Sequence, residues 1–526
     1  MAVGALVGRV TGFGRTAVIG AALGAGLVGD AYATAVMLPG ILYEVLLGGT
    51  LAGILVPLLV RARESDADRG EAYLQRLLTL AVVVFAGATA LLAAMTPFVV
   101  GLLTTEATSP AARDLLASLT YLLVPTVFCY GLGAVLAAAV NSRDHFATPT
   151  WAPVANNLTL IAIGLVFLTL PGQSTLTPET ITVTQVVVLG GGTLLGVAVQ
   201  AYTLWFVARR LGVRWRWRFD FRALRLTQLA GLLGWTLLYL AVSQVAVFLI
   251  LALAKSAGDR GSAGPFVYGN GWLLLMMGYG IAALPIIIAL VPRMGSSRST
   301  ADPTALDHNV RLGSRLITVV GVPVSLGLAI LGEPLAVVLF EWHRYTHEQA
   351  LDSGLVIAVA GLGLLPYALS QLQVFAFYAV SDARTPALLN IPVTALRVAL
   401  VLALYAAVPV RYAVPALMAG NVVAFAAAAV LGHRLLRRRL GRHAGDAAGP
   451  YRRVALAGAA AALVAWPLVS VIAGWFGDTK LASLGQLAVG GAALVAVYVG
   501  VGYLLRVAEL RAVTDRLVGR IRPSRS

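Results

Sequence analysis

Three arginines lie inside apolar stretches of the chain and are the residues best suited to bind an anion. Arg9 and Arg15 fall in the stretch 3–26, and Arg397 falls in 386–406. An arginine at the middle of a membrane span costs roughly 2.5–3.5 kcal/mol on insertion scales, so it is kept mostly where it faces a partner or a wet cavity. Guanidinium groups pair with phosphate through several hydrogen bonds. We therefore expect these three arginines to contact an anionic substrate.

Each arginine also has a plainer interpretation. Arg9 stands near the start of its stretch, where its side chain can extend to the membrane surface. Arg15 lies about 9 Å further along a helix, at 1.5 Å per residue, and favours a cavity. For Arg397, a structural ion pair and contact with substrate are equally good interpretations. The spacing of six residues puts Arg9 and Arg15 about 120° apart on the helix, so both can border one broad concave surface.

Acidic residues are equally few in the apolar stretches, and three of them are candidate supporting charges. Glu44 lies within 31–59 and can neutralise Arg9 or Arg15, which would make these charges structural, or hold them toward a cavity. Asp30 lies at the turn between the first two stretches, and Asp382 at the end of the tenth. For Asp30 and Asp382 the favoured interpretation is that they cap helices or tie loops.

Patterns typical of enzymes are missing, so we expect a transporter without metal or cofactor. His343 and His347 stand four residues apart, but without an HExxH pattern or further Cys or His ligands. The glycines of 189–196 neither follow a strand nor precede a P-loop lysine, and indicate helix packing. The driving force is then expected from ions, the membrane potential or the substrate gradient, and the coupling ion is not identified.

The composition requires a membrane to hold these residues. The 526 residues are 59% hydrophobic and 12% charged, with a single cysteine, and the mean hydropathy is +0.85. Such a chain cannot make a water-soluble surface, and its long apolar runs favour helices over barrel strands. We predict an all-α polytopic membrane protein with fourteen transmembrane helices. The predicted spans are 3–26, 31–59, 77–103, 115–140, 149–170, 184–208, 227–254, 263–291, 316–341, 353–379, 386–406, 412–433, 454–474 and 483–505.

The basic residues orient these spans. With fourteen spans, thirty arginines and lysines fall outside the spans on the side of the amino terminus and six on the other side. This asymmetry predicts a multi-pass protein of the cytoplasmic membrane with both termini in the cytoplasm. The net charge of +16 is therefore explained by the orientation of the protein in the membrane and does not indicate nucleic-acid binding. The segment 209–225, in which Trp and Phe alternate with arginines, resembles an RNA-binding patch, but an interfacial segment on anionic lipid is the favoured interpretation.

An internal repeat divides the chain. The segment 130–149 aligns without gaps to 367–386, an offset of 237 residues, and the prolines Pro97 and Pro334 recur at the same offset. We predict two parallel six-helix halves around a central cavity, followed by two extra helices. The expected domains are 1–225 with spans 1–6, 226–440 with spans 7–12, and 441–526 with spans 13–14 and a basic cytoplasmic tail.

The first hairpin carries a family resemblance. The segment 8–62, with its "RVTGFGR" core and the "DAYATAVMLP" spacing, is similar to the amino-terminal signature of the MurJ (MviN) lipid II flippases. These belong to the multidrug/oligosaccharidyl-lipid/polysaccharide exporter superfamily, and "LYEVLLGG" is similar to actinobacterial members. The resemblance covers spans 1–12. It implies that Arg9 and Arg15 are the family's first-span cavity arginines and that Asp30 is the acid after that span.

Three positions depart from the family pattern. Thr16 stands where the family usually has Asp, Tyr43 where many members have a second-span arginine, and 263–291 has no charge in place of the eighth-span arginine. The resemblance therefore implies a cavity with fewer cations than usual.

The resemblance implies that the protein moves lipid II, an undecaprenyl-pyrophosphate disaccharide-pentapeptide, from the inner to the outer leaflet by alternating access. The partners would be lipid II, membrane lipids and cell-wall synthesis proteins. Two alternatives stay open. One is export of another polyprenyl-linked glycan or an amphiphilic drug. The other is a scaffold for cell-wall enzymes that transports nothing.

Overall fold

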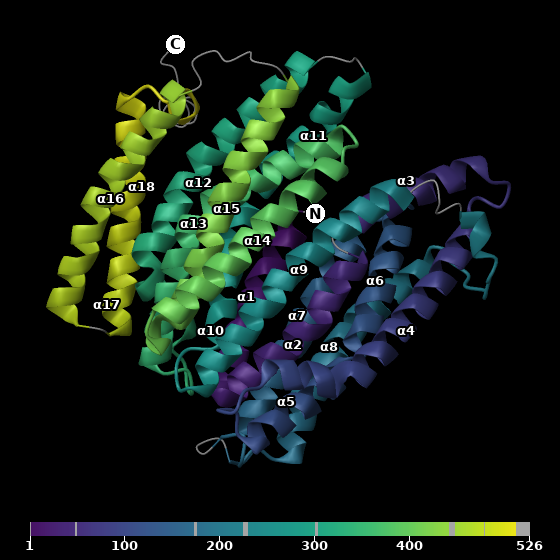
Figure 1. Ribbon diagram of the computed structural model, residues 1–526, viewed down its shortest axis with the longest axis horizontal. Helices are drawn as coiled ribbons and strands as arrows, with labels where there is room; N and C mark the ends of the chain where they lie inside the picture. Colours follow the sequence, from purple (N-terminus) through teal and green to yellow (C-terminus); the bar gives the residue numbers. More distant parts are fainter. Residues whose placement is uncertain are drawn as a thin grey trace, which may run out of the picture. The chain divides into compact units, whose positions relative to one another are not determined.

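The structure of the chain is a computed structural model that describes residues 2–47, 50–172, 176–224, 230–299, 303–440, 448–477 and 479–511. These ranges are helical and contain no strand (Figure 1). The longer helices are α1 (Ala2–Leu23), α2 (Leu27–Leu47), α3 (Thr50–Ser65), α4 (Glu71–Leu103), α5 (Pro110–Leu123), α6 (Thr126–Asn141), α7 (Ala147–Thr169), α8 (Val183–Arg210), α9 (Ala230–Asp259), α10 (Pro265–Ala282), α11 (Leu284–Ser299), α12 (Pro303–Phe340), α13 (His347–Ala379), α14 (Arg384–Ala407), α15 (Ala413–Leu440), α16 (Ala448–Phe476) and α18 (Gly491–Leu504).

The expectation of an all-helical multi-pass membrane protein is confirmed. Within the described ranges, eleven helices are long and apolar enough to cross a membrane, or twelve when the bent pair α10 and α11 counts as one span. The count of fourteen stays a prediction. It depends on treating α1, and α2 with α3, as two further spans.

Prolines break two of the predicted spans into pairs of helices. The span expected at 263–291 bends by 50° between α10 and α11, where Pro285 lacks the N–H needed to continue the helix. The span expected at 115–140 consists of α5 and α6, which meet at Val124 and Pro125. Hydropathy identifies the apolar length of such a segment but not its bend.

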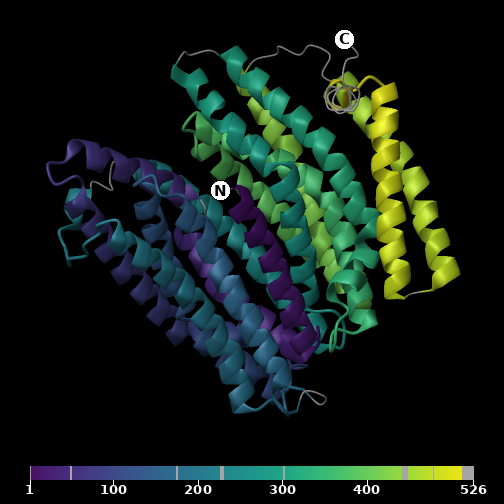
Figure 2. The same ribbon diagram turned by 180° about the vertical axis from the view of Figure 1, so that it is seen from behind.

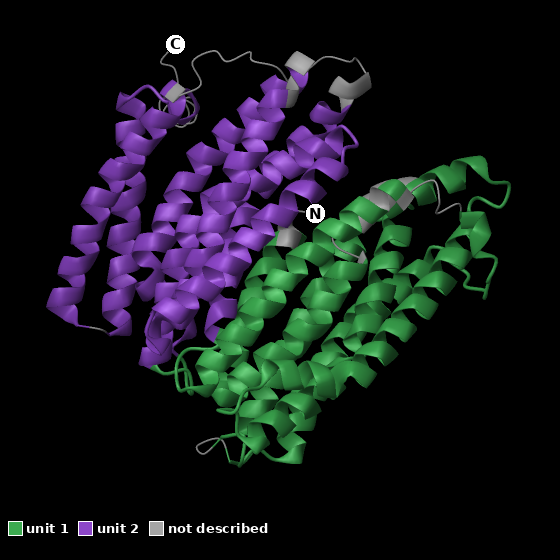
Figure 3. Ribbon diagram, viewed as in Figure 1, with its two compact units in different colours: residues 1–266, 342–346 green, residues 267–341, 347–526 purple. Residues whose placement is uncertain are grey.

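The described helices form two compact units (Figure 3). Unit 1 comprises residues 1–266 and 342–346, and unit 2 comprises 267–341 and 347–526. Helix α9, where the second copy of the repeat begins, belongs to unit 1 and packs on α2. In unit 2, α16 and α18 run side by side in both views of the ribbon (Figure 1, Figure 2).

Glycines let α1 approach α7 closely in unit 1. Gly4, Gly8 and Gly12 recur every fourth residue, so they share one face of the helix. A Cβ on Gly4 would lie 2.9 Å from Thr150, and one on Gly12 would lie 3.3 Å from the amide of Asn157. The glycine face of α1 thus lets the helix that carries Arg9 and Arg15 pack closely against α7.

Helices α12 and α13 approach still more closely in unit 2. A Cβ on Gly361 would lie 2.7 Å from the Cβ of Leu328 and 2.8 Å from the backbone nitrogen of Ala329. On the other helix, a Cβ on Gly332 would lie 2.7 Å from the carbonyl oxygen of Gly354. Backbone therefore contacts backbone, and neither helix can yield by rotating a side chain.

Two turns recur at the offset of the sequence repeat. Gly24 follows α1 with a φ of 70°, and Gly261 follows α9 with a φ of 81°. Asp144 precedes α7 with a φ of 59°, and Ser381 precedes α14 with a φ of 60°. Both pairs are 237 residues apart, and a left-handed residue that is not glycine is uncommon. The shared turn geometry supports the duplication beyond the matching of apolar letters.

We expect Gly361→Ala to destabilise unit 2 by about 1–3 kcal/mol, because the added methyl meets the α12 backbone. The measurement is the midpoint of thermal unfolding in detergent. Gly327→Ala is the matched control, since Gly327 lies on α12 with open space at its Cβ position and alanine favours a helix. Equal midpoints for the two variants would contradict the close crossing.

Candidate substrate-binding sites

Arg9 and Arg15 lie on α1 with half-buried side chains. Within the described part of the chain, neither guanidinium takes part in an ion pair. Glu44 on α2 is exposed and is not paired with either arginine there, so the neutralised arrangement considered above is not seen in this structure. Helix α1 thus carries two half-buried cations.

Two tyrosines of unit 1 are within electrostatic range of Arg15. Its charge acts on the hydroxyl groups of Tyr32 on α2 and Tyr130 on α6. The hydroxyl of Tyr32 is 2.9 Å from that of Thr193 on α8. Helices α2 and α6 therefore bring hydroxyl groups within reach of the Arg15 charge, and α8 adds the hydroxyl that contacts Tyr32. Hydroxyl groups near a guanidinium suit phosphate and sugar oxygens.

A pocket of about 140 Å³ opens beside Tyr130. Tyr43 and Tyr130 line it with their ring centroids 5.4 Å apart, and Gln200 on α8 supplies an amide. Asn156 on α7 donates a hydrogen bond to that amide at 3.2 Å. The pocket combines aromatic faces with a few fixed polar groups, which is the usual composition of a small-molecule subsite.

Arg397 lies in unit 2, on α14, and is only 9% exposed. Its Nε donates to Oδ1 of Asn421 on α15 at 2.5 Å, and Nδ2 of Asn421 donates to the hydroxyl of Tyr268 at 2.6 Å. The guanidinium also lies 5.7 Å from the ring centroid of Phe425. These three partners are neutral groups that orient the arginine.

An aromatic cluster continues from Phe425. Tyr367 on α13 lies 5.0 Å from Phe425 and 5.2 Å from Tyr279 between ring centroids, and Trp272 lies 6.2 Å from Tyr367. Tyr367 is the repeat counterpart of Tyr130. The duplicated tyrosine thus has an aromatic neighbourhood in each unit, beside Tyr43 in unit 1 and beside Phe425 in unit 2.

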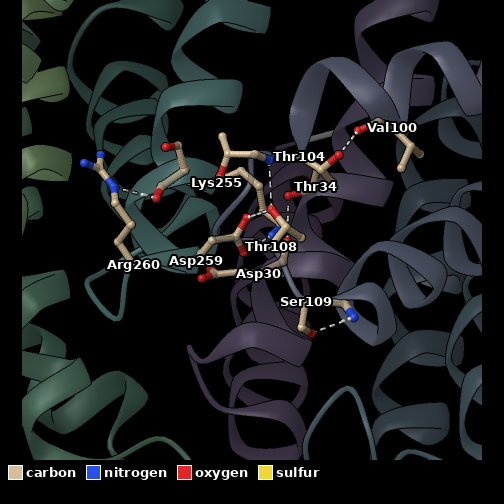
Figure 4. A network of polar contacts seen from close by, with 12 residues as sticks. Asp30, Thr34, Val100, Thr104, Thr108, Ser109, Lys255, Asp259 and Arg260 are labelled. Atoms are coloured by element: carbon tan, nitrogen blue, oxygen red, sulfur yellow. Dashed lines mark hydrogen bonds and ion pairs between the residues drawn. The ribbon is translucent and has the colours of Figure 1, made fainter.

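The other two candidate acids lie at turns. Asp382 accepts hydrogen bonds from the backbone nitrogen and the hydroxyl of Thr385, at 3.0 Å and 2.6 Å, and so ties the turn before α14. Asp30, in the first turn of α2, is 1% exposed and accepts a hydrogen bond from the backbone nitrogen of Phe266 at 3.0 Å. Figure 4 shows Asp30 beside Lys255, Asp259 and Thr108.

The two histidines considered for a metal differ in their surroundings. Nδ1 of His347 lies 2.8 Å from the carboxylate of Glu341, whereas His343 is exposed. The described ranges contain no group of three or more His, Cys, Asp or Glu residues that could hold a metal ion.

The segment of alternating arginines and aromatics extends from the end of α8. Arg76 on α4 donates to the Asp220 carboxylate at 2.7 Å, and this hydrogen bond holds the pKa of that carboxyl below its ordinary value. The rings of Trp217 and Phe219 stack 6.0 Å apart and are 58% and 64% exposed. Exposed aromatic rings beside arginines fit the interfacial interpretation.

Sequence reasoning missed Tyr32, Tyr130, Gln200 and Asn421 as candidates. The available signal was the repeat, which aligned Tyr130 with Tyr367 but was used only as evidence of duplication. A neutral side chain in an apolar stretch lacks the high free-energy cost that makes a buried charged residue noticeable in the sequence. Its proximity to an arginine depends on which helices pack together.

Solved structures with this arrangement of helices are known. The chain is similar to "Lipid II flippase MurJ, inward closed conformation" with a TM-score of 0.74 and 15% identity, covering 96% of this chain and 98% of that one. It is also similar to an inward-facing multidrug resistance MATE family transporter of the MOP superfamily, with a TM-score of 0.63 and 16% identity over 83% of this chain and 98% of that one. The fold is therefore that of MurJ and MATE membrane proteins.

The sequence identifies the family within this fold. Residues 19–484 match the profile of the family described as "Lipid II flippase MurJ". The chain belongs to this family. "Probable lipid II flippase MurJ" of Rhizobium meliloti (strain 1021) is 26% identical over 76% of this chain and 74% of its own length. The protein of the same name from Synechocystis sp. is 25% identical over 73% and 71%.

We expect Asn421→Ala to lower stability by about 2–3 kcal/mol, because it leaves the buried guanidinium of Arg397 without its amide partner. Asn421→Asp supplies a carboxylate at the same position and should retain the fold. Thermal unfolding in detergent measures both. If Asn421→Ala is as stable as the parent protein, the contact does not hold Arg397 in place.

Proposed function

We propose that the protein flips lipid II from the inner to the outer leaflet of the cytoplasmic membrane by alternating access, as a transporter and not an enzyme. The observation that carries the proposal is the family match over residues 19–484. The half-buried arginines of α1 supply the chemistry that an anionic head group needs. The relatives bear the same activity in their names.

The physical problem in flipping is the pyrophosphate. A bare charge cannot cross hydrocarbon because desolvation costs many kcal/mol. Guanidinium groups replace water around phosphate oxygens with charge-assisted hydrogen bonds. In this proposal Arg15 and Arg9 bind the pyrophosphate, and the polyprenyl tail stays in lipid. Tyr43 and Tyr130, which line the adjoining pocket, offer ring faces and hydroxyl groups to a sugar.

Arg397 has a separate place in the proposal. Asn421 and Phe425 orient its guanidinium, and the aromatic cluster beside it resembles the lining of the pocket in unit 1. We assign it to contact with substrate, with Asn421 as its positioning residue. Glu44 and Asp382 are assigned supporting roles. Asp382 acts by holding the turn before the helix that carries Arg397.

The topology belongs to the same proposal. Fourteen spans, two six-helix halves around a cavity and cytoplasmic termini are supported by the repeat and by the excess of basic residues on one side. An inside-negative potential then favours outward movement of an anion by about 2.3 kcal/mol per charge per 100 mV. Net transport therefore does not require ATP.

We predict that Arg15→Ala lowers the rate of lipid II flipping in proteoliposomes by about 10–100-fold, the value of a lost charge-assisted hydrogen bond or two. Arg15→Lys should retain part of the rate, since it keeps the charge but loses the planar donor set. The matched control is Arg113→Ala, which removes an exposed arginine at the start of α5. An unimpaired Arg15→Ala protein would remove this residue from the mechanism.

Assays of the parent protein test whether lipid II is the cargo. Proteoliposomes that flip lipid II, and rescue of a strain depleted of its own flippase, would support the proposal. Failure of both assays with correctly folded protein would favour another polyprenyl-linked cargo.

A further inference from the structure

A cluster of charged side chains in unit 1 takes no part in the proposed substrate site. Asp30 lies in the first turn of α2, and Lys255 and Asp259 lie one helical turn apart near the end of α9 (Figure 4). Asp30 is 1% exposed, and the side chains of Lys255 and Asp259 are each 1% exposed. Charges so deeply buried are rare unless each has a partner.

Two of the three charges compensate each other. The Lys255 ammonium forms an ion pair with Oδ1 of Asp259, and the hydroxyl of Thr108 donates to Oδ2 of the same carboxylate at 2.5 Å. Asp259 therefore has a partner on each oxygen. The pair is electrically neutral as a unit.

Asp30 is the third charge and has no ion pair within the described ranges. Its Oδ1 accepts the backbone N–H of Phe266 at 3.0 Å. Lys255 and Asp259 act on it electrostatically with opposite sign. An ionised Asp30 would thus add one net negative charge to a buried cluster that is otherwise neutral, and such a charge is costly in an apolar interior.

The carboxyl group of Asp30 lies very close to two glycines. A Cβ on Gly258 would lie 2.5 Å from Oδ2 of Asp30, and one on Gly264 would lie 2.6 Å from Oδ1. The carboxyl group therefore sits against bare backbone on two sides. A proton can neutralise it there.

Other charged groups near the cluster face away. Arg260 donates to the carbonyl oxygen of Ser256 and is exposed. In the segment 342–346, Arg344 donates through its side chain to the carbonyl oxygen of Leu176. Tyr345 packs on Phe266 with ring centroids 6.0 Å apart. Among the described residues, Lys255 and Asp259 are the charged groups that act on Asp30.

We propose that Asp30 binds one exchangeable proton and that the Lys255–Asp259 pair governs its loading. Loss of the proton places a negative charge between α2 and the α9–α10 turn. Rebinding of a proton neutralises that charge. Because α2 follows the helix of Arg9 and Arg15, the proton can be linked to movement of the cargo. This link, unlike the binding of the proton, rests on the proposed function.

The direct test is infrared spectroscopy of the purified protein during a pH titration. The protonated-carboxyl band should contain a component that is present at low pH and disappears as the pH rises. This component is missing from the difference between the parent protein and Asp30→Asn only if Asp30 does not titrate. Asp259→Asn leaves Lys255 to favour the ionised form of Asp30, so about a tenfold higher proton concentration should be needed for loading. Lys255→Met should shift the titration in the opposite direction.

The controls separate titration from structural damage. Glu106→Gln removes an exposed acid from the loop before α5 and should leave the Asp30 component unchanged. A titration of Asp30→Asn that matches that of the parent protein in every component would overturn the proposal. So would an Asp259→Asn protein that folds and titrates like its parent, because a purely structural cluster would not govern the proton.

The second arm measures flipping in proteoliposomes at several pH values. A pH dependence that moves with Asp259→Asn in the same direction as the infrared titration supports the link. Flipping that proceeds without any pH dependence overturns the link and leaves the proposed function intact. If the parent protein flips no lipid II at all, the proposed function fails, and the infrared titration still decides whether Asp30 binds a proton.

Discussion

The cost of placing charge in an apolar interior governs this protein. A buried charge must have a partner, contact water or lose its charge. The structure shows three solutions in different places. Lys255 and Asp259 pair with each other, Arg397 is bound by a neutral amide and lies beside an aromatic ring, and Arg9 and Arg15 stay half-buried without an ion pair in the described ranges. The functional assignments follow from these differences.

Close backbone packing determines where such groups can stand. Gly4, Gly8 and Gly12 hold α1 against α7, so the arginines of α1 are carried by a helix that cannot easily rotate. Gly258 and Gly264 lack a Cβ, and a methyl group at either position would overlap the Asp30 carboxyl group. Without a hydrophobic driving force between helices in lipid, such packing is a main source of helix association. The same residues therefore stabilise the fold and position its charges.

Gene duplication explains why related features recur in both units. The paired turns at Gly24 and Gly261, and the tyrosines Tyr130 and Tyr367, lie 237 residues apart. The charges do not follow this symmetry, since the counterpart of Arg397 in the first copy is Leu160. A duplicated scaffold with unlike charges gives the two units different chemical roles.

The sequence by itself determined the all-helical class, the family and the few costly charges, because apolar length and intramembrane arginines are local properties of the chain. It also indicated that Asp382 ties a turn, since the nearby Thr385 can bind it within one loop. Only the tertiary structure decided that Asp30 meets Lys255 and Asp259, which are more than two hundred residues away, or that Arg15 lies near Tyr130. The bend at Pro285 and the choice of neighbouring helices were likewise settled in three dimensions. Contacts between distant segments depend on how whole helices pack, and hydropathy along the chain carries no record of that packing.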